Sequence, residues 1–229
     1  MTASPRLTAR IAGLFYLLMF LPGGVAISAR AKLIVNGNAA ATAANIVAHE
    51  ALFRGAFAGD VLVVAFYLVV IALFYELFKP VNGSVSLLAA CFGLAACTIQ
   101  AVACVFQYAP SYVLGSAPYL SAFKPDQLQA MAYLFLKLYS GTYGIALVFF
   151  GFYGVLIGYL VFKSSFMPRT LGVLMAIAGA SWLVFLSPPL GTRLFPYLLA
   201  TGIGELLLMG WLLVFGVNAE RWKERAGAS

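Results

Sequence analysis

The sequence predicts an all-α, polytopic integral membrane protein with six transmembrane helices, and three observations support this fold class. Of the 229 residues, 63% are hydrophobic and only 9% are charged. A soluble domain carries roughly 25% charged residues, so this chain cannot cover itself with a water-facing surface. The hydrophobic residues gather into six runs, most of them close to the roughly 20 residues with which a helix crosses a bilayer. We therefore expect a single transmembrane domain over residues 1–229 and not a soluble or disordered chain.

The elements follow from where the apolar runs begin and end. The expected spans are 11–29, 56–78, 86–108, 141–162, 171–186 and 197–217. Ala39–Phe53, with Asn38 as its N-cap, is predicted to be a helix that leads straight into the second span. Asp126–Tyr139 is predicted to continue into the fourth span. Both extensions would then project from the bilayer on the same side, which we expect to be the outer side.

Local chemistry marks several of the expected boundaries. Three prolines lie just before or at expected helix starts, where a missing N–H costs nothing: Pro125, Pro168 and Pro196. Glu50 and Arg54 stand four residues apart with the acid first, the favourable order for an ion pair on a helix. The triplet Pro22-Gly23-Gly24 is expected to interrupt the first helix. Glycines that recur over 141–144 and 151–158 are typical of close helix packing in a membrane.

The distribution of charge predicts the orientation of the chain. Lysine and arginine number 14 against 7 acidic residues, and the basic residues stand singly at the ends of the apolar runs. Eight of them fall in short segments on the side of the termini: Arg6, Arg10, Lys79, Lys163, Arg169, Arg221, Lys223 and Arg225. The positive-inside rule therefore predicts a multi-pass protein of the inner (plasma) membrane with both termini in the cytoplasm. No basic stripe with interleaved aromatic residues occurs in the sequence, so nucleic acid is not an expected partner.

Depth in the membrane identifies the candidate site. A charge within the hydrocarbon is costly and usually functional. Counting 1.5 Å per residue along each helix places Glu205 roughly 10–12 Å below the outer edge. Thr201 lies one helical turn away on the same face. Four polar residues of other helices are expected at a similar or slightly shallower level: Gln100, Ser181, Tyr143 and Asp60. We expect these six residues to form an outward-facing polar layer that binds a ligand.

Two classes of function remain open for this layer. One is a membrane protein that binds or transports a small or lipid-like ligand around Glu205. The other is a non-catalytic accessory or structural subunit of a larger membrane complex, or a homo-oligomer, in which the polar groups only satisfy one another, as a protonated Glu205 paired with Gln100 would. A membrane enzyme ranks third, because no nucleophile–base pair and no set of metal ligands is visible.

Searches for motifs that carry chemistry return nothing specific. His49 is the single histidine of the chain, which leaves no His-based metal site and no pair of histidines to ligate haem. No G-x-S-x-G elbow, Walker A loop or Rossmann fingerprint occurs. The three cysteines share one apolar run without a C-x-x-C spacing and are expected to pack as small hydrophobic residues. The sequence therefore predicts no catalytic residue, no metal and no cofactor.

Six strings, in this order along the chain, resemble a known bacterial membrane family, the domain of unknown function 4386. They are ARIAGLFYLL (9–18), PVN (80–82), LVFFG (147–151), GYL (158–160), PRTLG (168–172) and GEL (204–206). The resemblance implies a six-span membrane protein without an established activity. The family pattern has an acid and a histidine near the positions of Lys137 and Tyr139, and a histidine at that of Tyr153, so no chemistry resting on these histidines is implied here. The position of Glu205 matches the pattern.

Overall fold

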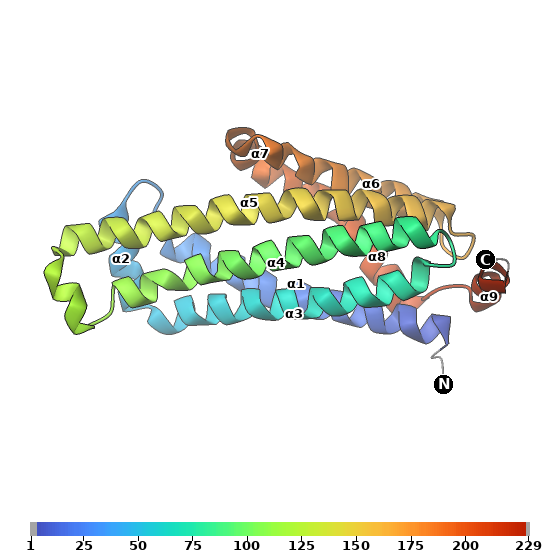
Figure 1. The fold of residues 1–229 in the computed structure, drawn as a ribbon, viewed down its shortest axis with the longest axis horizontal. Helices are drawn as coiled ribbons and strands as arrows, with labels where there is room; N and C mark the ends of the chain where they lie inside the picture. Colours follow the sequence, from blue (N-terminus) through green and yellow to red (C-terminus); the bar gives the residue numbers. More distant parts are fainter. Residues whose placement is uncertain (1–3, 228–229) are drawn as a thin grey trace. The chain divides into compact units, whose positions relative to one another are not determined.

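The computed structural model describes residues 4–227, and within them it contains helices and no strands (Figure 1). The helices in chain order are α1 (Pro5–Leu33), α2 (Ala39–Ala48), α3 (Glu50–Phe78), α4 (Gly83–Val113), η1 (Pro118–Ala122), α5 (Pro125–Lys163), α6 (Arg169–Trp182), η2 (Leu183–Leu186), α7 (Pro188–Thr201), α8 (Ile203–Val214) and α9 (Ala219–Gly227). Two of these, η1 and η2, are short 3-10 helices. The all-α class predicted from the sequence is therefore confirmed.

Five segments are long and apolar enough to cross a membrane. They are α1, α3, α4, α5 and the run Arg169–Leu186, which joins α6 to η2. A sixth candidate is the pair α7 and α8, which meet at a bend of 52°. The described chain thus has five spans by length and composition, or six if the bent pair crosses as one.

The described residues fall into two compact units. Unit 1 holds residues 4–18, 66–98 and 144–227, and unit 2 holds residues 19–65 and 99–143. Helices α6 to α9 belong to unit 1, whereas α2 and η1 belong to unit 2. Each of the remaining helices contributes one segment to each unit.

In unit 2, the expected extension of the second span is two helices and not one. Asn38 caps α2 as predicted, because its side-chain oxygen accepts a hydrogen bond from the Ala41 N–H at 2.9 Å. The chain then leaves the helical conformation at His49, with φ −127° and ψ 44°, before α3 begins. Ile46 of α2 and Phe53 of α3 belong to one buried hydrophobic cluster, together with Leu33 and Leu136. The prediction of one helix over Ala39–Phe53 is therefore wrong.

The first helix is continuous, contrary to the expected interruption at Pro22-Gly23-Gly24. Proline inside a membrane helix is tolerated where neighbouring helices cover the freed backbone groups. Gly59 of α3 lets the two helices approach closely at this point, because a Cβ at position 59 would lie 2.9 Å from the Pro22 carbonyl oxygen. Three small residues, Ala26, Ala29 and Ala56, continue the same close contact between α1 and α3. Close helix–helix packing in unit 2 thus accompanies the continuity of α1 at Pro22.

In unit 1, glycines let α5 and α6 pack backbone against backbone. A Cβ at Gly158 would lie 2.6 Å from the Ala176 nitrogen and the Gly172 oxygen, and one at Gly154 would lie 2.9 Å from the Gly179 Cα. Such approaches are possible only without side chains at these positions. The interpretation of these glycines as packing residues is therefore confirmed for the part of α5 that belongs to unit 1. Gly141, by contrast, has open space around it.

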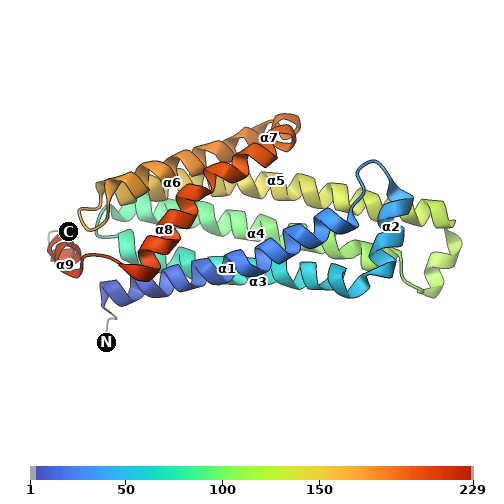
Figure 2. The same cartoon turned by 180° about the vertical axis from the view of Figure 1, so that it is seen from behind.

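The sixth expected span differs in its start and in its straightness. Helix α7 begins at Pro188, nine residues before the expected start at Tyr197, so Pro196 lies inside a helix and not at its start. The chain is extended at Ser187, and a proline at the first helical position then loses no hydrogen bond. Helix α8 packs on α6 and on the first part of α1 (Figure 2), since a Cβ at Gly204 would lie 2.5 Å from the Leu174 oxygen and one at Gly13 would lie 2.8 Å from the Leu213 nitrogen.

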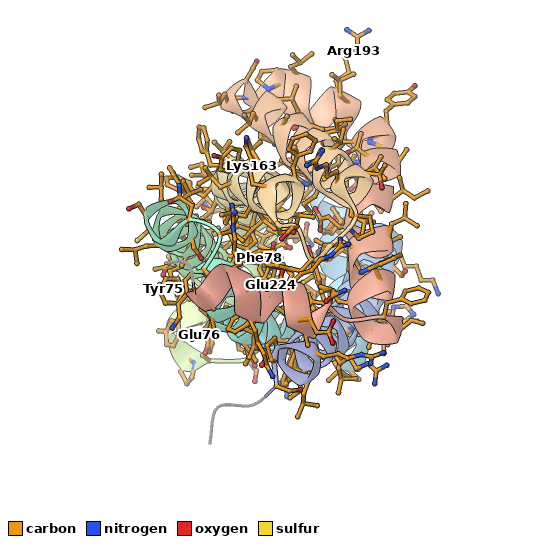
Figure 3. The ribbon with its side chains drawn as sticks, turned by 90° about the vertical axis from the view of Figure 1, so that its right-hand side faces the viewer. Tyr75, Glu76, Phe78, Lys163, Arg193 and Glu224 are labelled. Atoms are coloured by element: carbon orange, nitrogen blue, oxygen red, sulfur yellow. The ribbon has the colours of Figure 1, made fainter. Side chains whose placement is uncertain are left out.

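The short helix α9 closes one end of unit 1. Figure 3 looks onto this end, where α9 lies in front of the segment of α3 that carries Tyr75, Glu76 and Phe78. The Trp222 indole N–H donates a hydrogen bond to the Leu77 carbonyl at 2.8 Å. This bond satisfies one of the carbonyls that the end of α3 leaves without an intrahelical partner.

Trp222→Phe is expected to loosen α9 without changing the rest of unit 1, because it removes about 1 kcal/mol of hydrogen bonding. Trypsin cleaves after Arg221 and Lys223 only when α9 opens, so the rate of tryptic cleavage should rise about fivefold. Trp211→Phe is the matched control, since the Trp211 ring contacts Phe215 and its indole N–H has no hydrogen bond to any residue between 4 and 227. Equal cleavage rates in the two variants would contradict the proposed role of Trp222.

Candidate functional site

An ion pair buried in unit 2 is the centre of the candidate site. Arg30, in the last turn of α1, pairs with Asp60 of α3, and their side chains are only 13% and 6% exposed. The Tyr139 hydroxyl donates to the same Asp60 oxygen at 3.4 Å, and the Arg30 guanidinium carbon lies 5.1 Å from the centre of the Tyr139 ring. Tyr143 stacks on Tyr139 with ring centres 5.9 Å apart. We call these four residues the Arg30 cluster.

A buried amide borders the cluster. Gln107 of α4 is fully buried, and its side chain lies beside Asp60. Neither its amide nitrogen nor its amide oxygen makes a hydrogen bond of normal geometry with any described residue. Buried polar groups nearly always have such a partner. Gln107 therefore borders the ion pair, with its amide close to Asp60 but outside normal hydrogen-bond geometry.

Two members of the cluster, Arg30 and Tyr139, line a cavity of about 420 Å³, which we call the Arg30 pocket. Its polar lining comes from the end of α1, the following loop and α5: Arg30, Asn36, Tyr133, Lys137, Tyr139 and Ser140. The loop is held against α5 because the Gly37 N–H donates to the Tyr133 hydroxyl oxygen at 2.7 Å. Gly37 has φ +77°, a conformation that favours glycine. The loop geometry thus depends on Gly37.

The charges of the Arg30 pocket do not cancel. Asp60 neutralises Arg30, whereas Lys137 has no carboxylate within ion-pair distance among residues 4–227. The Lys137 ammonium lies 5.1 Å from the centre of the Tyr133 ring, which holds it at the pocket wall. No acidic side chain lines the pocket. The pocket therefore carries one uncompensated positive charge and attracts an anionic group.

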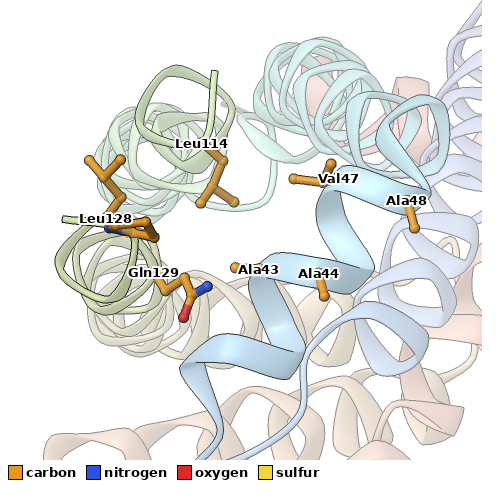
Figure 4. A pocket seen from close by; sticks show the side chains of 8 residues that line it. Ala43, Ala44, Val47, Ala48, Leu114, Leu128 and Gln129 are labelled. Atoms are coloured by element: carbon orange, nitrogen blue, oxygen red, sulfur yellow. The ribbon is translucent and has the colours of Figure 1, made fainter. Parts of the chain in front are cut away.

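A second cavity in unit 2 is apolar. It measures about 480 Å³ and lies between α2, the residues that follow α4 and the start of α5 (Figure 4). Its lining includes Ala43, Val47, Leu114 and Leu128, with Gln129 as its single long polar side chain. Ligand sites combine apolar walls with a few placed polar groups that fix orientation. The Arg30 pocket meets this condition, and the apolar cavity does not.

In unit 1, Glu205 is held by two neutral donors. One carboxylate oxygen accepts a hydrogen bond from the Tyr16 hydroxyl and the other from the Trp182 indole N–H, each at 3.3 Å. Ser181 and Thr201 pair separately, with their hydroxyl oxygens 2.7 Å apart. Each of these hydroxyls also lies within hydrogen-bond distance of a carbonyl in its own helix. These contacts are of the kind expected for polar groups that satisfy one another.

The six residues expected to form one layer are thus divided between the units. Glu205, Ser181 and Thr201 belong to unit 1, whereas Asp60, Gln100 and Tyr143 belong to unit 2. Within unit 2, Asp60 and Tyr143 meet in the Arg30 cluster. Gln100 is buried on α4, and no hydrogen bond joins it to Asp60. The structure therefore brings these residues together in part and adds partners that the sequence did not suggest.

Arg30 is the functional candidate that sequence reasoning missed. The first span was expected to end at Ala29, which assigned Arg30 to a loop. Helix α1 instead continues to Leu33, so Arg30 stays on the helix and faces α3. The sequence did contain a signal for this pair. Arg30 follows the end of the first expected span, and Asp60 lies near the start of the second, so the two opposite charges lie toward the same side of the membrane. Lys137 and Tyr139 were likewise assigned to a region outside the hydrocarbon.

Metal binding has no support in the described part of the chain. Among residues 4–227, no three His, Cys, Asp or Glu side chains come close enough to hold an ion. His49 is exposed at the end of α2, where a ring nitrogen lies 3.1 Å from the Asn45 carbonyl oxygen. The three cysteines are free thiols, and Cys97 and Cys104 are buried.

Comparisons with known proteins give a family and no function. No solved structure matches the chain. An uncharacterized protein of Archaeoglobus fulgidus is 37% identical over 73 residues, which cover 30% of this chain and 43% of that protein. The aligned part is thus less than half of the relative's length. The family model described as "Domain of unknown function (DUF4386)" matches residues 11–216, which is most of the chain. The chain therefore belongs to this family.

Proposed function

We propose that the protein binds a small ligand in the Arg30 pocket, and that the ligand carries one negative charge and a short apolar part. The observation that supports this most directly is an unpaired cation, Lys137, at the wall of a pocket beside a buried ion pair. A buried charge in a membrane helix is expensive and is usually kept for function. The buried pair of Arg30 and Asp60 therefore supports a functional role for this region beyond helix packing.

The lining of the pocket supports a monoanion. Lys137 supplies one positive charge without a counter-ion, and Asn36 and Ser140 offer neutral hydrogen-bonding groups near it. A carboxylate matches this set, since hydrogen bonds to charged groups are the stronger ones. Ala31, Ile34 and Leu136 supply apolar contacts for a few carbon atoms. A ligand with a larger negative charge would lack a second free cation in the pocket.

This proposal moves the site from the surroundings of Glu205 to the Arg30 pocket. The groups around Glu205, Ser181 and Thr201 already have hydrogen-bond partners in unit 1. The alternative, an accessory subunit, would show a strip of small or aromatic residues that is open to a partner chain. The small-residue strip that the sequence offers on α5 is filled by α6 of the same chain at Gly154 and Gly158. Ligand binding is therefore the better-supported function.

The orientation of the pocket follows from the distribution of charge. By the positive-inside rule, the protein lies in the inner (plasma) membrane with both termini in the cytoplasm. Arg30 lies at the far end of α1 from the N-terminus, so the pocket would open to the outside. The ligand would then be taken from the exterior, as in a binding or transport protein.

Hexanoate is a suitable probe, with the neutral hexanamide as its matched control. We expect the purified chain in detergent to bind hexanoate more tightly than hexanamide, as measured by isothermal titration calorimetry. Lys137→Gln should weaken hexanoate binding about tenfold, the effect of losing one charged hydrogen bond. Lys137 is exposed and makes no ion pair among the described residues, so its replacement should not disturb folding.

Lys32→Gln provides the control variant, since it removes the same charge from unit 2 outside the pocket lining. Its affinity for hexanoate should equal that of the unmodified chain. Equal binding of hexanoate and hexanamide would overturn the proposal of an anion site. Equal losses in Lys137→Gln and Lys32→Gln would show a general effect of charge and overturn the proposed location.

A further inference from the structure

We propose a second binding site, in unit 1, for the phosphate headgroup of an anionic phospholipid. A cavity of about 450 Å³ lies where α8 gives way to α9, and Arg6 of α1 lines it. Its other walls include Trp211, Phe215 and Asn218. We call it the Arg6 pocket. It shares no residue with the Arg30 pocket, and the proposal does not depend on ligand binding there.

Arg6 lines the pocket with no partner for its guanidinium among residues 4–227, unlike two other arginines at this end of unit 1. Arg10 donates to the Val214 carbonyl at 3.0 Å, and Arg221 donates to the Ser165 carbonyl at 3.1 Å. The guanidinium groups of Arg10 and Arg221 are therefore already engaged with backbone carbonyls of the chain. The Arg6 guanidinium has no hydrogen bond or ion pair with any residue between 4 and 227, although Glu220 also lines the pocket.

The backbone fixes the place of Arg6 in the pocket. Gly216 has φ +67°, which turns the chain between α8 and α9 in a conformation that favours glycine. The turn passes close to Arg6, since a Cβ at position 216 would lie 3.1 Å from the Arg6 Cγ. The aliphatic part of Arg6 thus borders the turn, and Arg6 lines the pocket. An arginine guanidinium matches two oxygens of a phosphate at once.

Aromatic side chains supply the apolar part of a lipid site. The rings of Trp211 and Phe215 lie 4.5 Å apart, and Phe215 is 55% exposed. They stand at the boundary between the apolar helix α8 and the charged helix α9. Tryptophan and tyrosine concentrate at such membrane–water boundaries, where headgroups meet acyl chains. A lipid would place its phosphate on Arg6 and the start of its acyl chains on these rings.

Charge favours an anionic lipid over a zwitterionic one. The first helical turns of α1 and the helix α9 carry five basic residues, Arg6, Arg10, Arg221, Lys223 and Arg225, against two acidic ones, Glu220 and Glu224. Basic groups at the end of a membrane helix attract anionic headgroups. Phosphatidylglycerol carries a net negative charge, which would compensate the net positive charge at this end of unit 1. Phosphatidylcholine carries no net charge, because its choline balances its phosphate.

Native mass spectrometry of the purified full chain tests the proposal. Mixed micelles would contain phosphatidylglycerol and phosphatidylcholine in equal amounts, and we expect phosphatidylglycerol to be retained preferentially. Arg6→Gln should reduce its retention about tenfold, and Arg6→Lys should restore part of it. Arg225→Gln is the matched control, because it removes a nearby charge outside the pocket lining and should leave retention unchanged.

Each outcome decides for or against the lipid site. Equal retention of the two lipids, or equal losses in Arg6→Gln and Arg225→Gln, would overturn it. Displacement of phosphatidylglycerol by millimolar inorganic phosphate would identify a site for free anions and would also overturn it. Should Arg6→Gln fail to fold, the lipid preference and the phosphate competition in the unmodified chain still decide. Hexanoate binding should not change in Arg6→Gln, which separates this site from the Arg30 pocket.

Discussion

Gly158→Ala is expected to lower the free energy of unfolding by at least about 2 kcal/mol, the cost of forcing extra volume into a close-packed contact. The added Cβ would lie 2.6 Å from the Ala176 nitrogen and from the Gly172 oxygen. Both are backbone atoms, so no side-chain rotation can make room and α5 must move away from α6. Thermal unfolding in detergent, followed by circular dichroism, measures the effect.

Gly141→Ala is the matched control on the same helix. No atom lies within 4 Å of the position that a Cβ would take there, so the substitution introduces no clash. Alanine is favoured over glycine in a helix by up to about 1 kcal/mol. We therefore expect Gly141→Ala to leave stability unchanged or to raise it slightly. Equal melting temperatures for the two variants would contradict the close packing of α5 and α6.

Asp60→Asn is expected to cost about 3–5 kcal/mol of stability, because it leaves the buried Arg30 charge without its counter-ion. The two side chains are 13% and 6% exposed, so water replaces the lost partner only in small part. Chemical unfolding in mixed micelles gives the free energy. The exposed pair of Glu50 and Arg54, with side chains 56% and 59% exposed, provides the comparison. Glu50→Gln should cost no more than about 0.5 kcal/mol.

Removing both members of the buried pair separates stability from binding. The double variant Arg30→Met with Asp60→Leu buries no charge, so it should recover most of the stability that Asp60→Asn loses. It should nevertheless lose affinity for hexanoate if the Arg30 cluster shapes the ligand site. A double variant as unstable as Asp60→Asn would contradict the electrostatic origin of the loss. A double variant that is stable and binds hexanoate normally would show that the ion pair has no role in ligand binding.

Hydropathy and local motifs predicted the elements well where the controlling interactions are local. The spans that became α3 and α4, the Asn38 cap and the continuity of α5 over 39 residues all follow from composition, side-chain hydrogen bonding and helix propensity. The glycines of α5 were correctly interpreted, because a recurrent glycine in an apolar helix has few other uses.

Three predictions were wrong because average hydropathy does not mark the exact place where a helix breaks, continues or begins. The chain leaves the helical conformation at His49, between two apolar helices. Helix α1 continues through Pro22, where Gly59 of α3 allows a close approach of the two helices. Helix α7 begins at Pro188, eight residues before Pro196.

Composition and hydropathy were enough to predict an all-α chain whose helices are apolar enough for a membrane, because they are properties of the chain and need no contacts. The family resemblance rests instead on six short strings, and it implies no established activity. Which charges are compensated depends on tertiary contacts. Depth counting selected Glu205, whereas packing paired Arg30 with Asp60 and left Lys137 and Arg6 without a carboxylate within ion-pair distance among residues 4–227. The depth of a residue in the membrane can be counted along its own helix. Whether its charge is compensated depends on which side chains of other helices face it.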